Sequence, residues 1–232
     1  MIGGLKVSRL LTFKLFLLNK FRFIEYKRVF ALIREKKNNL LYKGTPPLYA
    51  ECLWVNPQHC KKSIRIGSQT LTSGKIINKK KAFKDYTLLV EDRIIKKCLE
   101  HWVDGKTWEE TGLIDDMMEM ITTYGSYDGC SSREEVVDRY RKLDKLYDRT
   151  KVLGRLKSKE ELDEDSFREE GGILMHIGPK GELFFGGNGN HRMAIALALK
   201  LDIIPVQLGG VYVLSFPHLK KLRAIAKTMP ND

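Results

Sequence analysis

The residues with the clearest chemical potential form a glycine-rich turn, Phe185-Gly-Gly-Asn-Gly-Asn-His-Arg192, which leads into an apolar stretch of helical composition, Met193 to Leu199. Glycines let a backbone turn tightly and approach a ligand closely, and the first N–H groups of a helix attract anions. Arg192 would add a guanidinium that suits phosphate. The turn therefore predicts an anion-binding site, with a plain connector as the alternative.

Short extended segments surround this turn. Residues 173–177 and 182–185 are expected to form two strands, joined by the turn Gly178-Pro-Lys-Gly181, and residues 203–208 form a third extended run. We expect these strands to belong to a small mixed sheet in an α+β fold.

The hairpin, the Gly-Gly-x-Gly-Asn-His-Arg turn, the Ala-rich helix and the Ile-Pro-Val strand together resemble the ParB/sulfiredoxin-like fold over residues 172–213. Upstream, residues 53–58 end in Asn-Pro-Gln and look like the opening strand of that family. In the family, a Gly-x-His-Arg-type loop at a helix start binds nucleotide phosphates. The resemblance thus implies a nucleotide site made by Gly186, Gly187, Asn188, Gly189, Asn190, His191 and Arg192.

Two branches of this family are disfavoured by the residues themselves. A sulfiredoxin-like enzyme needs a nucleophilic cysteine before the His-Arg pair, but Asn190 occupies that place and offers no thiolate. A chromosome-partition protein needs a helix-turn-helix and a dimerisation element after the fold, and residues 215–232 are enough for one short basic helix and a tail.

We therefore expect a phosphotransferase or NTPase that uses ATP or another nucleoside triphosphate with Mg²⁺ and acts on an unidentified acceptor. Glu51, at the start of the strand-like upstream segment, is the candidate base for the acceptor hydroxyl. His191 is the second candidate catalytic residue, able to donate to a phosphate oxygen. No residues are assigned as metal ligands. The alternative is a non-enzymatic ParB-like protein that binds nucleic acid.

Charge is distributed unevenly along the chain. Residues 1–97 hold 22 Lys/Arg against 6 Asp/Glu, a net charge of +16, whereas residues 98–232 have a net charge of −4. Large apolar residues alternate with Lys and Arg in the first forty positions. This pattern is typical of a helix in an anionic membrane interface, of a basic helix packed on its own domain, or of a nucleic-acid contact. Of these alternatives, packing on its own domain is the leading one, and residues 1–38 are the segment that would meet the membrane in the first.

The cysteines, Cys52, Cys60, Cys98 and Cys130, form no Cys-x-x-Cys pair, and no cleavable signal peptide is evident. We therefore expect a cytoplasmic protein, with peripheral membrane association as a further expectation.

The expected organisation has three parts. Residues 1–45 form a basic amphipathic helical segment, residues 46–216 the main domain, and residues 217–232 a short helix and tail. A helical insertion is expected at about residues 85–165, with helices at 107–124 and 133–148, and residues 159–170 are expected to be an acidic surface link.

Overall fold

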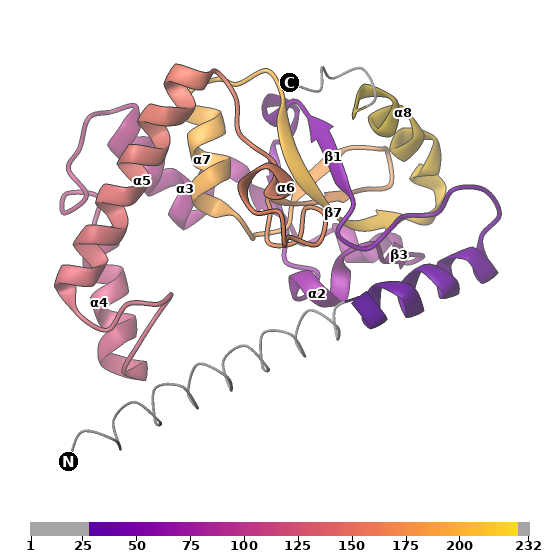
Figure 1. Ribbon diagram of the computed structural model, residues 1–232, viewed down its shortest axis with the longest axis horizontal. Helices are drawn as coiled ribbons and strands as arrows, with labels where there is room; N and C mark the ends of the chain where they lie inside the picture. The colour runs from indigo at the N-terminus through magenta and orange to yellow at the C-terminus, as the bar shows by residue number, and fades with distance from the viewer. Residues whose placement is uncertain (1–27, 227–232) are drawn as a thin grey trace, which may run out of the picture.

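The computed structural model describes residues 28–226, so expectations for residues 1–27 and 227–232 lie outside it. The fold is α+β, as expected: a mixed sheet of seven strands runs through the middle of the main domain, and helices surround it (Figure 1).

The sheet has the order β1-β7-β5-β6-β2-β4, and β3 pairs with β7. The strands are β1 (Cys52–Val55), β2 (Lys62–Ser63), β3 (Ile76–Ile77), β4 (Thr87–Leu88), β5 (Leu174–Ile177), β6 (Leu183–Phe185) and β7 (Ile204–Tyr212). The longest strand, β7, organises the sheet, because it pairs antiparallel with β1 and parallel with both β5 and β3.

The helices fall before, between and after the strands. Residues 28–41 are helical. The other α-helices are α2 (Gln69–Thr72), α3 (Arg93–Trp102), α4 (Leu113–Tyr124), α5 (Arg133–Leu153), α6 (Lys159–Leu162), α7 (Asn190–Ala198) and α8 (Phe216–Ala226). Short 3₁₀ helices are η1 (Pro57–His59), η2 (Lys80–Phe83), η3 (Leu89–Glu91) and η4 (Val213–Ser215).

Two sequence expectations for the helical region need correction. The helix expected at 107–124 begins only at Leu113, because Gly112 adopts a φ of +71° and breaks the preceding turns. The stretch expected as an acidic surface link, 159–170, includes α6 and contains Glu169, whose side chain is completely buried. Its composition predicted exposure, but one of its carboxylates belongs to the core.

Both faces of the sheet are covered, which explains why β5, β6 and β7 are buried nearly throughout. Neighbouring side chains of β6 point to opposite faces, as the strand geometry requires. Phe185 joins the main core, whereas Phe184 joins a second cluster with Ile64, Ile77 and Phe83. An uninterrupted apolar run is the sequence sign of such a doubly covered strand.

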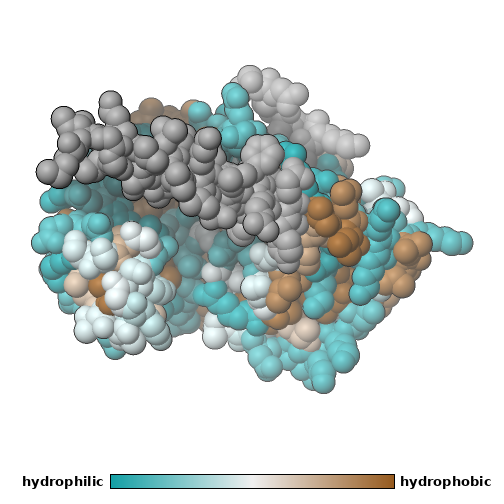
Figure 2. All heavy atoms as spheres, turned by 60° about the horizontal axis from the view of Figure 1, so that its bottom comes forward, coloured by the Kyte–Doolittle hydropathy of each residue, from teal (hydrophilic) through white to brown (hydrophobic). Residues whose placement is uncertain are grey.

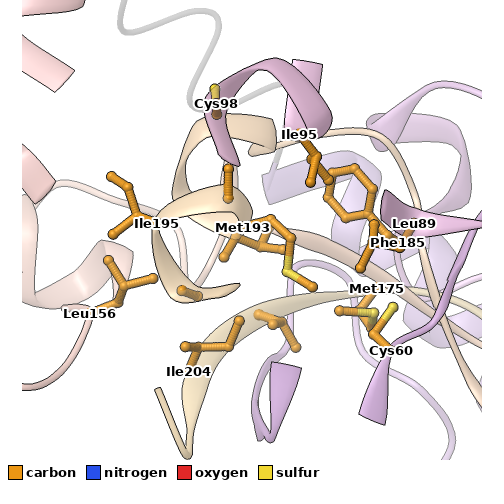
Figure 3. Close-up of a cluster of buried hydrophobic side chains, with 14 of the residues drawn as sticks. Cys60, Leu89, Ile95, Cys98, Leu156, Met175, Phe185, Met193, Ile195 and Ile204 are labelled. Carbon is orange, nitrogen blue, oxygen red and sulfur yellow. The ribbon is translucent and has the colours of Figure 1, made fainter. Parts of the chain in front are cut away.

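Helix α7 occupies the centre of the main core. Its residues Met193 to Ala196 are completely buried. Figure 3 shows Met193 surrounded by Ile95 of α3 and by Met175 and Phe185 of the sheet. Since α7 is enclosed by the sheet and by α3, its position and the direction of its N-terminus are fixed by packing.

A buried histidine supports the sheet next to the glycine turn. His176 of β5 is fully buried, and its Nδ1 accepts a hydrogen bond from the N–H of Gly210 at 2.7 Å. A Cβ on Gly209 would lie 2.2 Å from this ring nitrogen, and one on Gly186 would lie 2.8 Å from Nε2. The glycines at these two positions therefore make room for the imidazole.

Burial lowers the pKa of His176 from 6.5 to about 4. The unfolded chain thus takes up a proton at higher pH than the folded protein, and this contribution to stability is complete above pH 6.5 and is lost as pH falls toward 4. In the variant His176→Asn, the asparagine side chain can still accept the hydrogen bond from Gly210 but does not titrate. We therefore expect its free energy of unfolding to fall by about 3 kcal/mol less than that of the parent protein over this pH range. Urea denaturation across this pH range measures it.

The exposed His59 provides a matched control, because His59→Asn should leave the pH dependence as in the parent protein. An unchanged acid destabilisation in His176→Asn would contradict the assignment.

Candidate functional site

The glycine turn lies where expected, between β6 and the N-terminus of α7. Gly187 and Gly189 adopt φ values of +80° and +78°, which only glycine reaches without strain. Gly189 is also the N-cap of α7, and a Cβ there would lie 2.8 Å from the Cα of Ile173. Because a glycine N-cap offers no side chain, none caps the first N–H groups of α7.

A cavity of about 490 Å³ opens at this N-terminus. The turn and α7 form one wall, and the helical region forms the other, with α3 and α5 packed against α7 (Figure 1). The lining residues are Arg93, Ile94, Leu113, Asp116, Met117, Met120, Tyr127, Asp128, Arg139, Tyr140, Leu143, Gly171, Asn188, Gly189, Asn190, His191 and Arg192.

Five of the seven residues expected to bind phosphate line this cavity, and Gly186 and Gly187 do not. Gly186 is buried against His176, and the carbonyl of Gly187 accepts a hydrogen bond from Arg65. These two glycines shape the turn, whereas the residues from Asn188 to Arg192 face the cavity.

Basic side chains from three elements reach the cavity. Arg93 of α3 lies 3.3 Å from Asp116, which also pairs with Lys97 at 2.6 Å. Arg139 reaches the cavity from another helix, α5, and pairs with Asp128. Arg192 also lines the cavity and is paired with the buried Glu169, so each of the three arginines already has a carboxylate partner. An anionic ligand would bind these guanidinium groups beside or in place of the carboxylates.

Several polar atoms in the cavity wall are buried without a hydrogen-bond partner. They are Nε2 of His191, Oδ1 of Asn190 and Nε of Arg139. Burial, followed by the charge of Arg139, lowers the pKa of His191 to about 4, so its imidazole is neutral at physiological pH. Unpaired buried polar groups are costly, and a polar ligand in the cavity would satisfy them.

Arg192 has a structural contact that the sequence did not indicate. Its Nη1 lies 3.5 Å from Oε1 of the buried Glu169, and its Nη2 donates to the carbonyl of Lys157. The other carboxylate oxygen of Glu169 accepts from the N–H of Lys159 at 2.7 Å. Arg192 thus holds the segment before β5 against α7 while it also lines the cavity.

Glu51, the expected catalytic base, is not among the residues that line the cavity. Its Oε2 accepts from Nη2 of Arg223 at 2.8 Å and from the N–H of Leu48 at 3.0 Å, and its Oε1 contacts Nε of Arg223. This carboxylate is occupied in tying α8 to the start of β1. We therefore assign Glu51 a structural role.

The opposite wall of the cavity was missed by the sequence reasoning. Arg93, Asp116, Asp128 and Arg139 belong to a helical region that precedes the turn by 50 to 100 residues. They form no spaced motif, and their charges resemble those of any solvated helix. Only the packing of α3, α4 and α5 reveals them.

The cavity residues do not form a magnesium site by themselves. Asp116 and Asp128 are both paired with cations, and within residues 28–226 no group of three or more His, Cys, Asp or Glu side chains could hold a metal ion. Proteins usually hold Mg²⁺ through one or two carboxylates together with substrate phosphates. The expected Mg²⁺ therefore stays a prediction, and we derive no step through it.

Comparison of this chain with protein-family models, curated proteins and solved structures found no match. The geometry of the cavity therefore carries the functional argument.

The buried pair between Arg192 and Glu169 leads to a stability prediction. Arg192→Met should lower the free energy of unfolding by about 3–5 kcal/mol, because it leaves the Glu169 carboxylate buried and unpaired. The double variant Arg192→Met/Glu169→Gln should recover a large part of this loss, because it replaces the buried carboxylate of Glu169 by a neutral amide. Urea denaturation at neutral pH compares the two.

Arg141→Met is the matched control, because Arg141 forms an exposed ion pair with Asp138 at 3.0 Å. Its loss should stay below about 1 kcal/mol. If Arg192→Met and the double variant lost equal amounts of unfolding free energy, the unpaired charge of Glu169 would not be the cause of the destabilisation.

Proposed function

We propose that this protein binds a nucleoside triphosphate in the cavity in front of α7 and transfers its terminal phosphate to an acceptor or to water. The observation that carries the proposal is the convergence of the uncapped N-terminus of α7, a positive-φ glycine and three arginines on one cavity. Backbone N–H groups at a helix start together with guanidinium groups are a common way to bind phosphate.

The size and the remaining lining of the cavity support a nucleotide. A volume of about 490 Å³ falls within the usual range for small-molecule pockets, roughly 300–1,000 Å³. Met117, Met120, Tyr127 and Tyr140 supply apolar and aromatic surface to the cavity wall, and the ring of Tyr140 lies 6.2 Å from that of His191. Such surface suits a base or an apolar acceptor, while the phosphates would lie against residues 188–192.

His191 is our candidate for the proton transfer, in place of Glu51. Its lowered pKa keeps the imidazole neutral, and its Nε2 has no hydrogen-bond partner. In the proposed reaction the acceptor oxygen forms a bond to the terminal phosphorus, and the bond from phosphorus to the leaving diphosphate oxygen breaks. The proton of the acceptor hydroxyl moves to Nε2 of His191. Arg93 and Arg139 would stabilise the charge on the phosphate oxygens.

The ParB/sulfiredoxin-like resemblance is part of the same proposal. The order β5, β6, glycine turn, α7 and β7, with β1 beside β7, is consistent with it.

Binding is tested with Arg139→Gln. This variant removes a cation from the cavity wall, and we expect ATP binding to weaken about tenfold or more, since a hydrogen bond to a charged group contributes roughly 1.5–3 kcal/mol. Isothermal titration calorimetry with ATP gives the affinity. Arg141→Gln removes a cation from the same helix outside the cavity lining and serves as the control. The same weakening in both variants would indicate a general charge effect and contradict the assigned site.

Turnover is tested with His191→Gln. If His191 accepts the proton, release or transfer of the terminal phosphate of ATP should fall by roughly 10²–10⁴-fold while ATP affinity changes little. In the parent protein, activity should be constant from neutral pH downward and decline as pH approaches 4, where the imidazole becomes protonated. Full activity of His191→Gln would exclude this role, and ATP binding without any turnover would reduce the proposal to a nucleotide-binding module.

A further inference from the structure

The helix of residues 28–41 contacts the rest of the protein through both polar and apolar side chains. Arg34 and Asn38 donate four hydrogen bonds to backbone carbonyls within residues 47–74, at 2.8–3.2 Å. Glu35 pairs with Arg168 at 2.6 Å. Ala31 is buried, and the partly buried Phe30 packs on Tyr49 with the ring centroids 5.6 Å apart.

The side of this helix that faces away from the domain carries four large apolar residues that are exposed to solvent. The exposed fractions are 51% for Val29, 61% for Leu32, 63% for Ile33 and 86% for Leu40. Their spacing places them on one side of the helix. Figure 2, turned to bring this side of the molecule forward, shows hydrophobic surface interrupted by hydrophilic surface. The helix thus has apolar residues on both sides: Phe30 and Ala31 pack on the domain, and the four residues named above remain exposed.

The helix itself carries more positive than negative charge. Residues 28–43 contain five Lys/Arg and a single acid, Glu35, which is ion-paired with Arg168 of the domain. Lys36 and Lys37 are exposed among the apolar residues. A hydrogen bond between Tyr42 and Asn78, at 3.0 Å, brings the exposed run 79–81, three lysines, close to the end of the helix.

We propose that this side of the helix, defined by Val29, Leu32, Ile33, Leu40 and the neighbouring Lys36 and Lys37, docks on an anionic lipid membrane. A membrane interface buries apolar side chains and binds lysines through its lipid phosphates and carboxylates, which matches both features. A nucleic acid would match only the lysines.

Within residues 28–226 no helix is long and apolar enough to cross a bilayer. A feature of the neighbouring sequence agrees with docking on an anionic membrane. The sequence of residues 1–27, which leads into this helix, is also rich in Leu and Phe, with six Lys/Arg against one Asp/Glu. Figure 1 shows the helix at the opposite end of the described structure from α4 and α5, so docking would leave the cavity accessible.

The test is co-sedimentation of the full-length protein with phosphatidylcholine vesicles that do or do not contain phosphatidylserine. The protein should bind the anionic vesicles and bind less as salt rises. Leu32→Glu/Ile33→Glu should weaken this binding about tenfold or more, because it places two carboxylates in the interface. Both residues are exposed, so the fold should be retained, which circular dichroism verifies.

Val152→Glu/Leu153→Glu is the matched control, since these residues are 90% and 48% exposed at the end of α5. It should bind anionic vesicles like the parent protein. Equal binding by Leu32→Glu/Ile33→Glu, or equal binding to vesicles without phosphatidylserine, would overturn the proposal. The proposal would also be overturned if the protein failed to bind vesicles but bound a short double-stranded DNA tightly, and if Leu32→Glu/Ile33→Glu left that DNA binding unchanged. ATP affinity, measured in parallel, separates this result from the proposed function of the cavity.

Discussion

The burial of α7 between the sheet and α3 is the constraint on which the site depends. Met193 to Ala196 have no exposed surface, so the helix cannot rotate or shift without opening the core. Its N-terminus is therefore directed at the cavity by packing. The chain must still pass from buried β6 into this buried helix within a few residues. The turn achieves this with two positive-φ glycines, where any side chain would be strained.

The opposite wall is held in place by a different interaction, a single carboxylate on α5. Asp144 accepts hydrogen bonds from the indole N–H groups of Trp102 and Trp108, at 3.1 and 2.9 Å, and contacts Nε2 of His101 at 3.1 Å. His101 and Trp102 belong to α3, while Trp108 lies between α3 and α4. Since α3 also packs on α7, the helices that carry Arg93 and Arg139 are connected to the glycine turn by continuous packing. Such rigidity suits a binding site, because it lowers the cost of ordering charged groups around a ligand.

The two proposals use separate parts of the molecule and different kinds of burial. In the cavity, polar atoms have lost water without gaining partners, so an incoming polar ligand would be stabilised. On the helix of residues 28–41 the situation is reversed. There, polar side chains have found partners in the domain and four large apolar ones remain in water, which favours contact with an apolar phase. A protein with both features would act on a nucleotide while associated with a membrane surface, close to lipid-linked or membrane-borne acceptors.

The local elements could be predicted from the sequence because their signals are local. The glycines before an Ala-rich stretch, the strand-like runs around them and Ser132 as N-cap of α5 all depend on residues within one or two turns of one another. Only the tertiary structure shows which carboxylates are occupied in buried ion pairs. Glu51 lies in a largely apolar stretch and Glu169 in a strongly polar one, yet each is buried against an arginine from another element, Arg223 and Arg192. The cavity itself, with Arg139 facing His191 across it, exists only because α3 and α5 pack against α7. No local pattern records such long-range packing, since burial depends on how elements distant in sequence come together.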